Sequence, residues 1–297
     1  MCVAPLTLKR NRDEWQTELN GHSTVTRVVP CGKCFQCLAR RRNGWSFRLH
    51  HQMNISSSAC FMTLTYGHAQ DDKGCLFGED PPLTENGLYT LDKTDLQKFL
   101  KRFRKFEKTR NKNGNTIKYY AVGEYGTKNH RPHYHLILFN ASPQCMAQSY
   151  MVAKKIWQKG SVDVASCNMA TINYVVGYVM SGAWAPEHEL DDRQPHFSLM
   201  SKGLGSSYLT DEIYDFHYDR MDTSVMHPSG FRIPLPRYYK DKIFSVEEKA
   251  ELYEINQRVR EVDWEEFVNI DFEKQVEETR QKIRLHERKN KKVRNTL

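Results

Sequence analysis

The hydrophobic pattern of the chain is strongest in two neighbouring stretches. Residues 134–139 form a continuous apolar run that contains one histidine, which is typical of a strand in the middle of a sheet. Residues 117–124 indicate a second strand, ending at Glu124. Gly126, Asn129 and Pro132 lie between the two stretches and favour a turn, so we predict that the strands pair antiparallel.

The polar residues of these two strands are predicted to meet on one face of the sheet. His133 and His135 are two residues apart, and alternate strand residues share a face. The turn would set Glu124 beside them, which gives two imidazoles and one carboxylate with open positions on an ion. A pair of hydrogen-bonded histidines without a metal is the alternative.

Weaker patterns predict the remaining elements. A helix near Thr94 has a capping-box pattern with Gln97, and Ser245 and Glu248 repeat that pattern before a polar C-terminal helical stretch. Glycine and proline mark loops over residues 67–90, 197–208 and 228–242. Further helices are expected over residues 38–53, 145–158 and 169–182, and further strands over residues 24–29, 59–66 and 160–164.

A pair of tyrosines is the second candidate for chemistry. Tyr174 and Tyr178 are four residues apart, so on the predicted helix both hydroxyls project from one face. Phenols beside a divalent ion can act as nucleophiles and become covalently attached to what they attack. Two tyrosines packed in a core are the alternative.

Three cysteines form a tight cluster. Cys31, Cys34 and Cys37 present thiolates over two short loops, which suits zinc or an iron–sulfur cluster. Three small, partly buried thiols at a helix N-terminus without a metal are equally compatible with the pattern. The candidates for a fourth ligand are Cys2, His50, His51 and Cys60.

The charge of the chain favours a polyanionic partner. The net charge is +8 and the sequence pI is near 9.0. No apolar run approaches the roughly 20 residues of a membrane span, and a secretion signal is not evident, so we expect a soluble, intracellular protein. The cations that could contact phosphates, or simply form a solvated basic surface, are Arg40, Arg41, Arg42, Arg48, Lys101, Arg102 and Lys202.

Three ordered motifs carry a resemblance to a known family. They lie at residues 61–66, 131–138 and 174–178, and their order resembles that of the HUH rolling-circle replication endonucleases. The paired tyrosines and the Pro-Cys-Gly-x-Cys-x-x-Cys segment are most similar to the replication initiator proteins of microviruses, especially the gokushovirus-like branch. The resemblance covers roughly residues 30–243.

The resemblance implies an α+β fold. Its centre would be an antiparallel sheet of about five strands in a split βαβ arrangement, with helices packed on one face. We accordingly expect an N-terminal segment with the cysteine cluster and a basic helix over residues 1–57. The endonuclease core would span residues 58–243, and a charged helical appendage would span residues 244–297.

The resemblance also implies a reaction on single-stranded DNA at a phage replication origin. Mg²⁺ or Mn²⁺ would be held by His133, His135 and Glu124, and zinc is possible at the cysteines. A tyrosine would attack the phosphate, remain linked to the 5′ side and free a 3′ hydroxyl. The host helicase and polymerase would then act in the bacterial cytoplasm. Family members often have lysines just after the second tyrosine; here Lys202 is the candidate for that cation.

Other classes stay open at this stage. A relaxase or transposase would use the same chemistry on different DNA. A non-enzymatic, zinc-stabilised nucleic-acid-binding protein would need only the cysteine cluster, with the histidines packed in the core. A hydrolase acting on small substrates through the histidine pair is less favoured, because no further ligand-rich motif is present.

Overall fold

The computed structural model describes residues 6–10, 25–70, 75–108, 116–126, 129–142, 149–178 and 188–252. The chain divides into two compact units. The first comprises Met1–Glu124, Pro132–Tyr208 and Ser224–Pro236, and the second comprises Tyr125–Arg131, Leu209–Thr223 and Arg237–Leu297. Most of the predicted C-terminal helical stretch lies outside the described residues.

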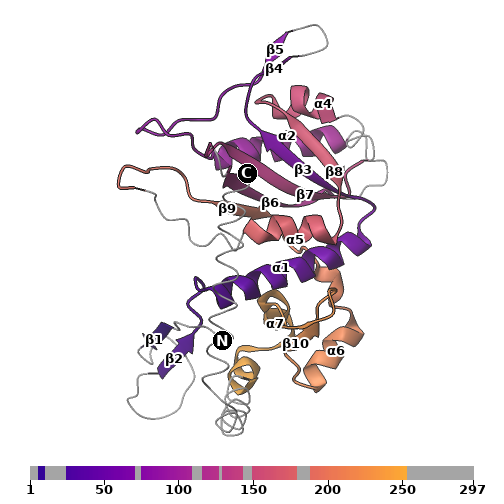
Figure 1. The fold of residues 1–297 in the computed structure, drawn as a ribbon. Coiled ribbons are helices and arrows are strands. Elements are labelled where there is room, and N and C mark those ends of the chain that lie inside the picture. Colours follow the sequence, from indigo (N-terminus) through magenta and orange to yellow (C-terminus); the bar gives the residue numbers. More distant parts are fainter. Residues whose placement is uncertain are drawn as a thin grey trace. The chain divides into compact units, whose positions relative to one another are not determined.

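A five-stranded antiparallel sheet forms the centre of the first unit (Figure 1). Its strand order is β8-β3-β7-β6-β9. The bounds are Ala59–Thr65 for β3, Lys118–Tyr125 for β6, Pro132–Phe139 for β7, Val162–Ser166 for β8 and Phe197–Met200 for β9. The predicted pair of strands is therefore β6 and β7, and the predicted α+β class is confirmed.

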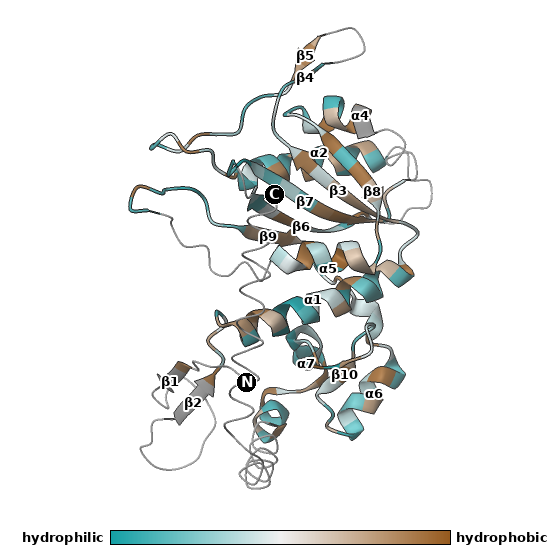
Figure 2. Ribbon diagram, in the orientation of Figure 1, coloured by the Kyte–Doolittle hydropathy of each residue, from teal (hydrophilic) through white to brown (hydrophobic). Residues whose placement is uncertain are grey.

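Helices cover both faces of this sheet, whereas we predicted helices on one face. On one face, α2 (Lys93–Lys108) buries its apolar stripe, and its Phe99 packs against Trp157, which contacts Tyr134 of β7. On the other face, α5 (Met169–Gly177) and α1 (Phe35–Ile55) pack over Ile137 and Phe139 of β7. The reason is the apolar run itself, which puts hydrophobic side chains on both faces of the strand. Figure 2 shows the apolar residues concentrated on these strands.

Two of the predicted loops contain regular structure. Residues 197–208 include β9, which pairs with β6 at the edge of the sheet, and the one-turn helix η4 (Ser206–Tyr208). Residues 228–242 include β11 (Arg232–Pro234), which pairs with β10 (Ser224–Met226). They also include most of α7 (Arg237–Ile243). These elements are short and have no clear hydrophobic period, which is why the sequence pattern missed them.

The caps of two helices can be compared with the prediction. The capping box of Ser245 and Glu248 is confirmed, because each side chain accepts the backbone N–H of the other residue. The predicted cap at Thr94 is wrong. The helix begins at Lys93, and the Asp92 carboxylate accepts the N–H of Thr94 at 2.6 Å.

The remaining elements complete the two units. In the first unit these are β1 (Leu6–Arg10) paired with β2 (Val25–Val29), and the small pair β4 (Ala69–Gln70) and β5 (Leu76–Phe77). Within the predicted helix at residues 145–158 lie α4 (Ser149–Val152) and the π-helix η2 (Ala153–Trp157). The second unit contains α6 (Asp211–Asp219) beside α7.

Candidate active site

The three predicted metal ligands converge on one face of the sheet. The Oε1 atom of Glu124 lies 2.5 Å from Nε2 of His133 and 3.0 Å from Nε2 of His135. Glu124 and His135 are buried, with 6% and 5% of their surfaces exposed, while the His133 side chain is 20% exposed. The group is thus closed on the sheet side and accessible from the side of His133.

A threonine of the neighbouring strand orients one of these histidines. Thr63 of β3 is paired with His135 of β7, and its Oγ1 lies 3.0 Å from Nδ1 of that ring. If Nδ1 carries the hydrogen and donates it to Thr63, the lone pair of Nε2 is directed at the position beside Glu124. We had expected Thr63 and Thr65 only to shape the floor of the site. The role of Thr63 becomes visible only once the register of β3 and β7 is known.

The electrostatics of the group suit a divalent cation. Burial by itself raises the pKa of Glu124, but hydrogen bonds from His133 and His135 outweigh it and lower the pKa below its usual value. The carboxylate is therefore ionised at neutral pH. One oxygen and two imidazole nitrogens, all within 4.8 Å of one another, form a two-histidine, one-carboxylate set that leaves coordination positions for a substrate.

The structure brings both tyrosines to these histidines. A reciprocal capping box between Asn168 and Thr171 fixes the start of α5, and Tyr178 is its C-terminal cap residue. The Tyr174 and Tyr178 rings lie 5.4 and 5.3 Å from the ring of His135, and Tyr178 is stacked on it. Their centroids are 5.1 Å apart, and Tyr174 is 51% exposed. The helix thus aligns the two phenols along one side of the ligand group.

The two phenols have different surroundings. Burial, followed by the negative charge of Glu124 and the hydrogen bond shared with Tyr174, raises the pKa of Tyr178 above its usual value. A cation beside Glu124 would offset the contribution of the carboxylate. The exposed Tyr174 has direct access to solvent. Removing a proton from Tyr178 therefore depends on the charge at the ligand group.

The predicted phosphate-binding cations are placed in two ways. Arg40, Arg41, Lys101 and Lys202 are exposed on the surface. Arg48 instead donates from Nε and Nη2 to the carbonyl of Leu204 and lies over the ring of Trp45. Arg102 donates to Gln158 and to the carbonyl of Trp157. The last two arginines thus serve packing of the first unit, whatever else they contact.

The cysteine cluster is a second, separate ligand group. The Sγ atoms of Cys31, Cys34 and Cys37 all lie within 4.8 Å of one another, and the N–H of Cys34 donates to Sγ of Cys31 at 3.3 Å. His50 follows Cys37 by 13 residues on the same helix, a rise of about 20 Å, so neither it nor His51 can complete this group. Cys60 is buried in β3, and Cys2 lies outside the described residues.

A search of the described residues for membrane spans found no helix with the length and apolarity that crossing a bilayer requires.

Comparison with known proteins identifies relatives of the chain. Residues 59–183 match the family model of the replication-associated protein ORF2, and this stretch holds all five residues of the candidate site. The replication-associated protein VP4 of Bdellovibrio phage phiMH2K is 26% identical over 229 residues, which cover 72% of this chain and 67% of that protein. The replication-associated protein ORF2 of Spiroplasma virus 4 is 26% identical over 258 residues, or 82% of this chain and 76% of that protein.

A third relative gives the same result. The replication-associated protein ORF4 of Chlamydia phage 1 is 26% identical over 242 residues, covering 75% of this chain and 56% of that protein. No solved structure matches the chain. The resemblance drawn from the sequence is thereby confirmed, and the chain is related to the phage replication-associated proteins of the microvirus type.

Proposed function

We propose that this protein is a replication initiation endonuclease that nicks and rejoins single-stranded DNA at a phage origin. The observation that carries the proposal is the convergence of two tyrosines on a carboxylate and two imidazoles, within the segment that matches the replication-associated family. A structural histidine pair would not need two phenols aligned along an open ligand group.

The residues divide the chemistry between them. A magnesium or manganese ion held by Glu124, His133 and His135 would neutralise charge on the scissile phosphate. The phenolate oxygen of one tyrosine attacks phosphorus after its proton has passed to water. The bond from phosphorus to the 3′ oxygen breaks, and that oxygen takes up a proton as it leaves. The products are a 5′-phosphotyrosine link and a free 3′ hydroxyl, which a host polymerase can extend.

A second phenol on the same helical face serves the end of the replication cycle. After one circle has been copied, the other tyrosine attacks the regenerated origin and becomes linked to its 5′ phosphate. The 3′ hydroxyl released by that cut attacks the first phosphotyrosine, which frees the first tyrosine and closes a circle. The ring separation of 5.1 Å between Tyr174 and Tyr178 suits this alternation, because both phenols can face one phosphate site.

The first test is the covalent adduct. A circular single-stranded genome of a related phage is incubated with the protein and Mn²⁺, and mass spectrometry then searches for nucleotide-modified tyrosine. Replacing both tyrosines (Tyr174→Phe with Tyr178→Phe) is expected to abolish the adduct while DNA binding is retained. Tyr89→Phe, which changes an exposed tyrosine outside the site, is the matched control and should keep the adduct. An adduct in the double variant would refute the assignment of the nucleophiles.

A relaxase or transposase is the second candidate, since its chemistry would be the same. The DNA that is nicked separates the two: a phage origin supports replication, whereas a transfer origin or element end supports the alternative. Under the replication proposal the host helicase and polymerase are partners, the bacterial cytoplasm is the place of action, and residues 58–243 are the endonuclease core.

We also propose that the cysteine cluster binds one zinc ion. Zinc–thiolate bonds of about 2.3 Å place the sulfurs of a tetrahedral site about 3.8 Å apart. Three Sγ atoms that all lie within 4.8 Å of one another can reach that spacing with small side-chain movements. An iron–sulfur cluster fits less well, because its cysteines bind different irons and stand further apart. The N–H of Cys34 that donates to Cys31 is a further stabilising contact for a thiolate.

Cys2 is the fourth ligand in this proposal. The pairing of Leu6 with Val29 brings the chain before β1 and the chain after β2 to the same end of the two-stranded pair. Cys2 precedes Leu6 by four residues and Cys31 follows Val29 by two, so at about 3.3 Å per residue the two thiols are within reach of a common ion. A zinc ion there would tie β1 and β2 to the start of α1 and take no part in the nicking reaction.

A further inference from the structure

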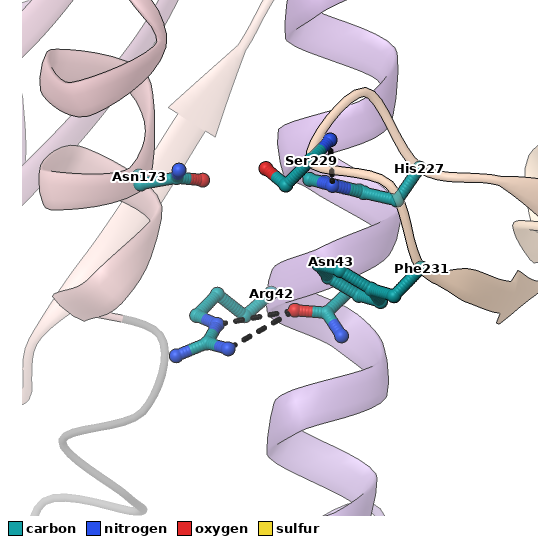
Figure 3. Close-up of a pocket in the computed structure, with 6 residues that line it drawn as sticks. All are labelled: Arg42, Asn43, Asn173, His227, Ser229 and Phe231. Carbon is teal, nitrogen blue, oxygen red and sulfur yellow. Dashed lines mark hydrogen bonds between the residues drawn. The ribbon is translucent and has the colours of Figure 1, made fainter.

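A small pocket lies beside the helix that carries the two tyrosines. It has a volume of about 200 Å³ and is formed where α1, α5 and the loop between β10 and β11 meet. Figure 3 shows its lining residues, which are Arg42, Asn43, Asn173, His227, Ser229 and Phe231. Asn173 immediately precedes Tyr174 in the sequence, so one wall of the pocket is continuous with the candidate active site.

A chain of hydrogen bonds fixes the orientation of the Asn173 amide. The N–H of Ser229 donates to Nδ1 of His227 at 3.1 Å, so the imidazole carries its hydrogen on Nε2. Nε2 then donates to the hydroxyl of Ser46 at 3.2 Å, and that hydroxyl donates to Oδ1 of Asn173 at 2.6 Å. Burial, together with the charges of His50 and Arg42, lowers the pKa of His227 and keeps this ring neutral.

The consequence is a pocket that offers donors. The amide oxygen of Asn173 is occupied, which leaves its NH₂ group to donate. The same holds for Asn43, whose Oδ1 accepts 3.2 Å bonds from Nε and Nη2 of Arg42. The Asn43 amide and the Nη1 group of Arg42 therefore also have hydrogens to give. Two amides and a guanidinium suit a ligand with several acceptors and a negative charge, such as a phosphate.

One aromatic ring stands at the same place. Phe231 is 43% exposed and is stacked on His227 with ring centroids 4.6 Å apart and an interplanar angle of 20°. Its position is therefore supported from one side, while its exposed surface can receive a base. Stacking on an aromatic ring is how proteins hold the bases of single-stranded DNA without reading their sequence.

We propose that this pocket binds one nucleotide of the DNA strand next to the nucleotide that is cut. Its phosphate would accept from Arg42, Asn43 and Asn173, and its base would stack on Phe231. The inference rests on the proposed nicking function, and it assigns the strand a path from the tyrosines along α5 to α1. Ser46 and His227 are positioning residues, because they act through the Asn173 amide.

Salt dependence tests the phosphate contact directly. The test measures the affinity of the full chain with Tyr174→Phe and Tyr178→Phe for a fluorescent single-stranded oligonucleotide over a range of KCl concentrations. In that background Asn173→Asp replaces the donor with a carboxylate of the same shape. It is expected to weaken binding about 10-fold and to reduce the slope of log K against log salt by about 0.7, the contribution of one phosphate. Arg42→Gln should reduce the slope by a similar amount.

The matched control is Asn54→Asp, which makes the same charge change at an exposed position of the same helix as Arg42. It should leave the slope unchanged. An equal slope change in both Asp variants would overturn the proposal, because the effect would then be one of overall charge. Binding of inorganic phosphate to the wild type that Asn173→Asp removes, with an unchanged DNA slope, would assign the pocket to free phosphate and would also overturn it.

The two proposals can fail separately. A normal adduct with an unchanged slope in Asn173→Asp would remove the nucleotide pocket and leave the nicking function standing. A reduced slope in a protein that forms no adduct would keep the pocket as a single-stranded DNA site and remove the nicking function.

Discussion

Glu124, His133 and His135 come from two paired strands of the central sheet, whereas Cys31, Cys34 and Cys37 lie within one short stretch at the start of α1. The ligand atoms of each group fall within 4.8 Å of one another. The first group offers one oxygen and two nitrogens from a buried, hydrogen-bonded floor. The second offers three sulfurs from residues that are only partly buried.

The difference separates two uses of a metal ion. Oxygen and nitrogen ligands bind magnesium or manganese loosely enough to keep positions for a substrate, and the tyrosines stand at those positions. Thiolates bind zinc tightly in closed four-coordinate sites that stabilise a fold. The comparison therefore predicts that damage to the first group removes catalysis without unfolding the protein, and that damage to the second does the reverse.

The largest expected effect is on catalysis at the first group. His135→Ala should lower the rate of single-turnover nicking by about 1000-fold, because the phosphate loses charge stabilisation worth several kcal/mol. A chelator should block wild-type nicking, and added Mn²⁺ should restore it. The measurement is cleavage of a labelled origin oligonucleotide by a protein whose fold is checked by circular dichroism.

Cys34→Ser is the matched comparison from the second group and should retain most of the nicking rate in protein that is still folded. Equal loss of activity in the two variants would contradict the division between a catalytic and a structural ion.

A smaller effect is expected at Thr63, which touches the first group through His135. Thr63→Val keeps the shape of the side chain and removes the hydroxyl that lies 3.0 Å from Nδ1. Loss of such an orienting contact costs about 10- to 100-fold in metal affinity or activity. A Mn²⁺ titration of the nicking rate should therefore need more metal to reach half its maximum.

Thr65→Val is the control for that variant, because Thr65 is paired with His133 on the same face of β3. It should change the titration little. If both valine variants behave alike, the hydroxyl of Thr63 has no special role.

The residues of the first group could be predicted because their strands have strong patterns. The run in β7 is apolar on both faces, and strand alternation then puts His133 and His135 together. The turn residues bring Glu124 back to them, and the i to i+4 spacing aligns the tyrosines. The sequence could not show the bond of Thr63 to His135, because that bond depends on the register between strands far apart in the chain.

The parts that the sequence missed have weak or competing local signals. All four residues of β9 are half-buried, so the strand has no alternation of apolar and polar positions and was assigned to a loop. At the start of α2, Asp92 and Thr94 are both good capping residues, and only the folded backbone selects Asp92. The Asn173 pocket was missed because its walls come from three separate parts of the chain.

The smallest effect on nicking, and the sharpest test of the second group, is expected from Cys2→Ser. The full chain is loaded with Co²⁺, whose visible and ultraviolet absorption reports how many thiolates bind the ion. The wild type should give the spectrum of four thiolates, and Cys2→Ser that of three thiolates with an oxygen ligand and a weaker affinity. Cys75→Ser, at an exposed position outside the cluster, should leave the spectrum unchanged. A four-thiolate spectrum that survives Cys2→Ser would remove Cys2 from the site. The absence of any thiolate–cobalt absorption in the wild type would reduce the cluster to three cysteines that hold no metal, and the contrast between the two ligand groups would then be one of metal against no metal.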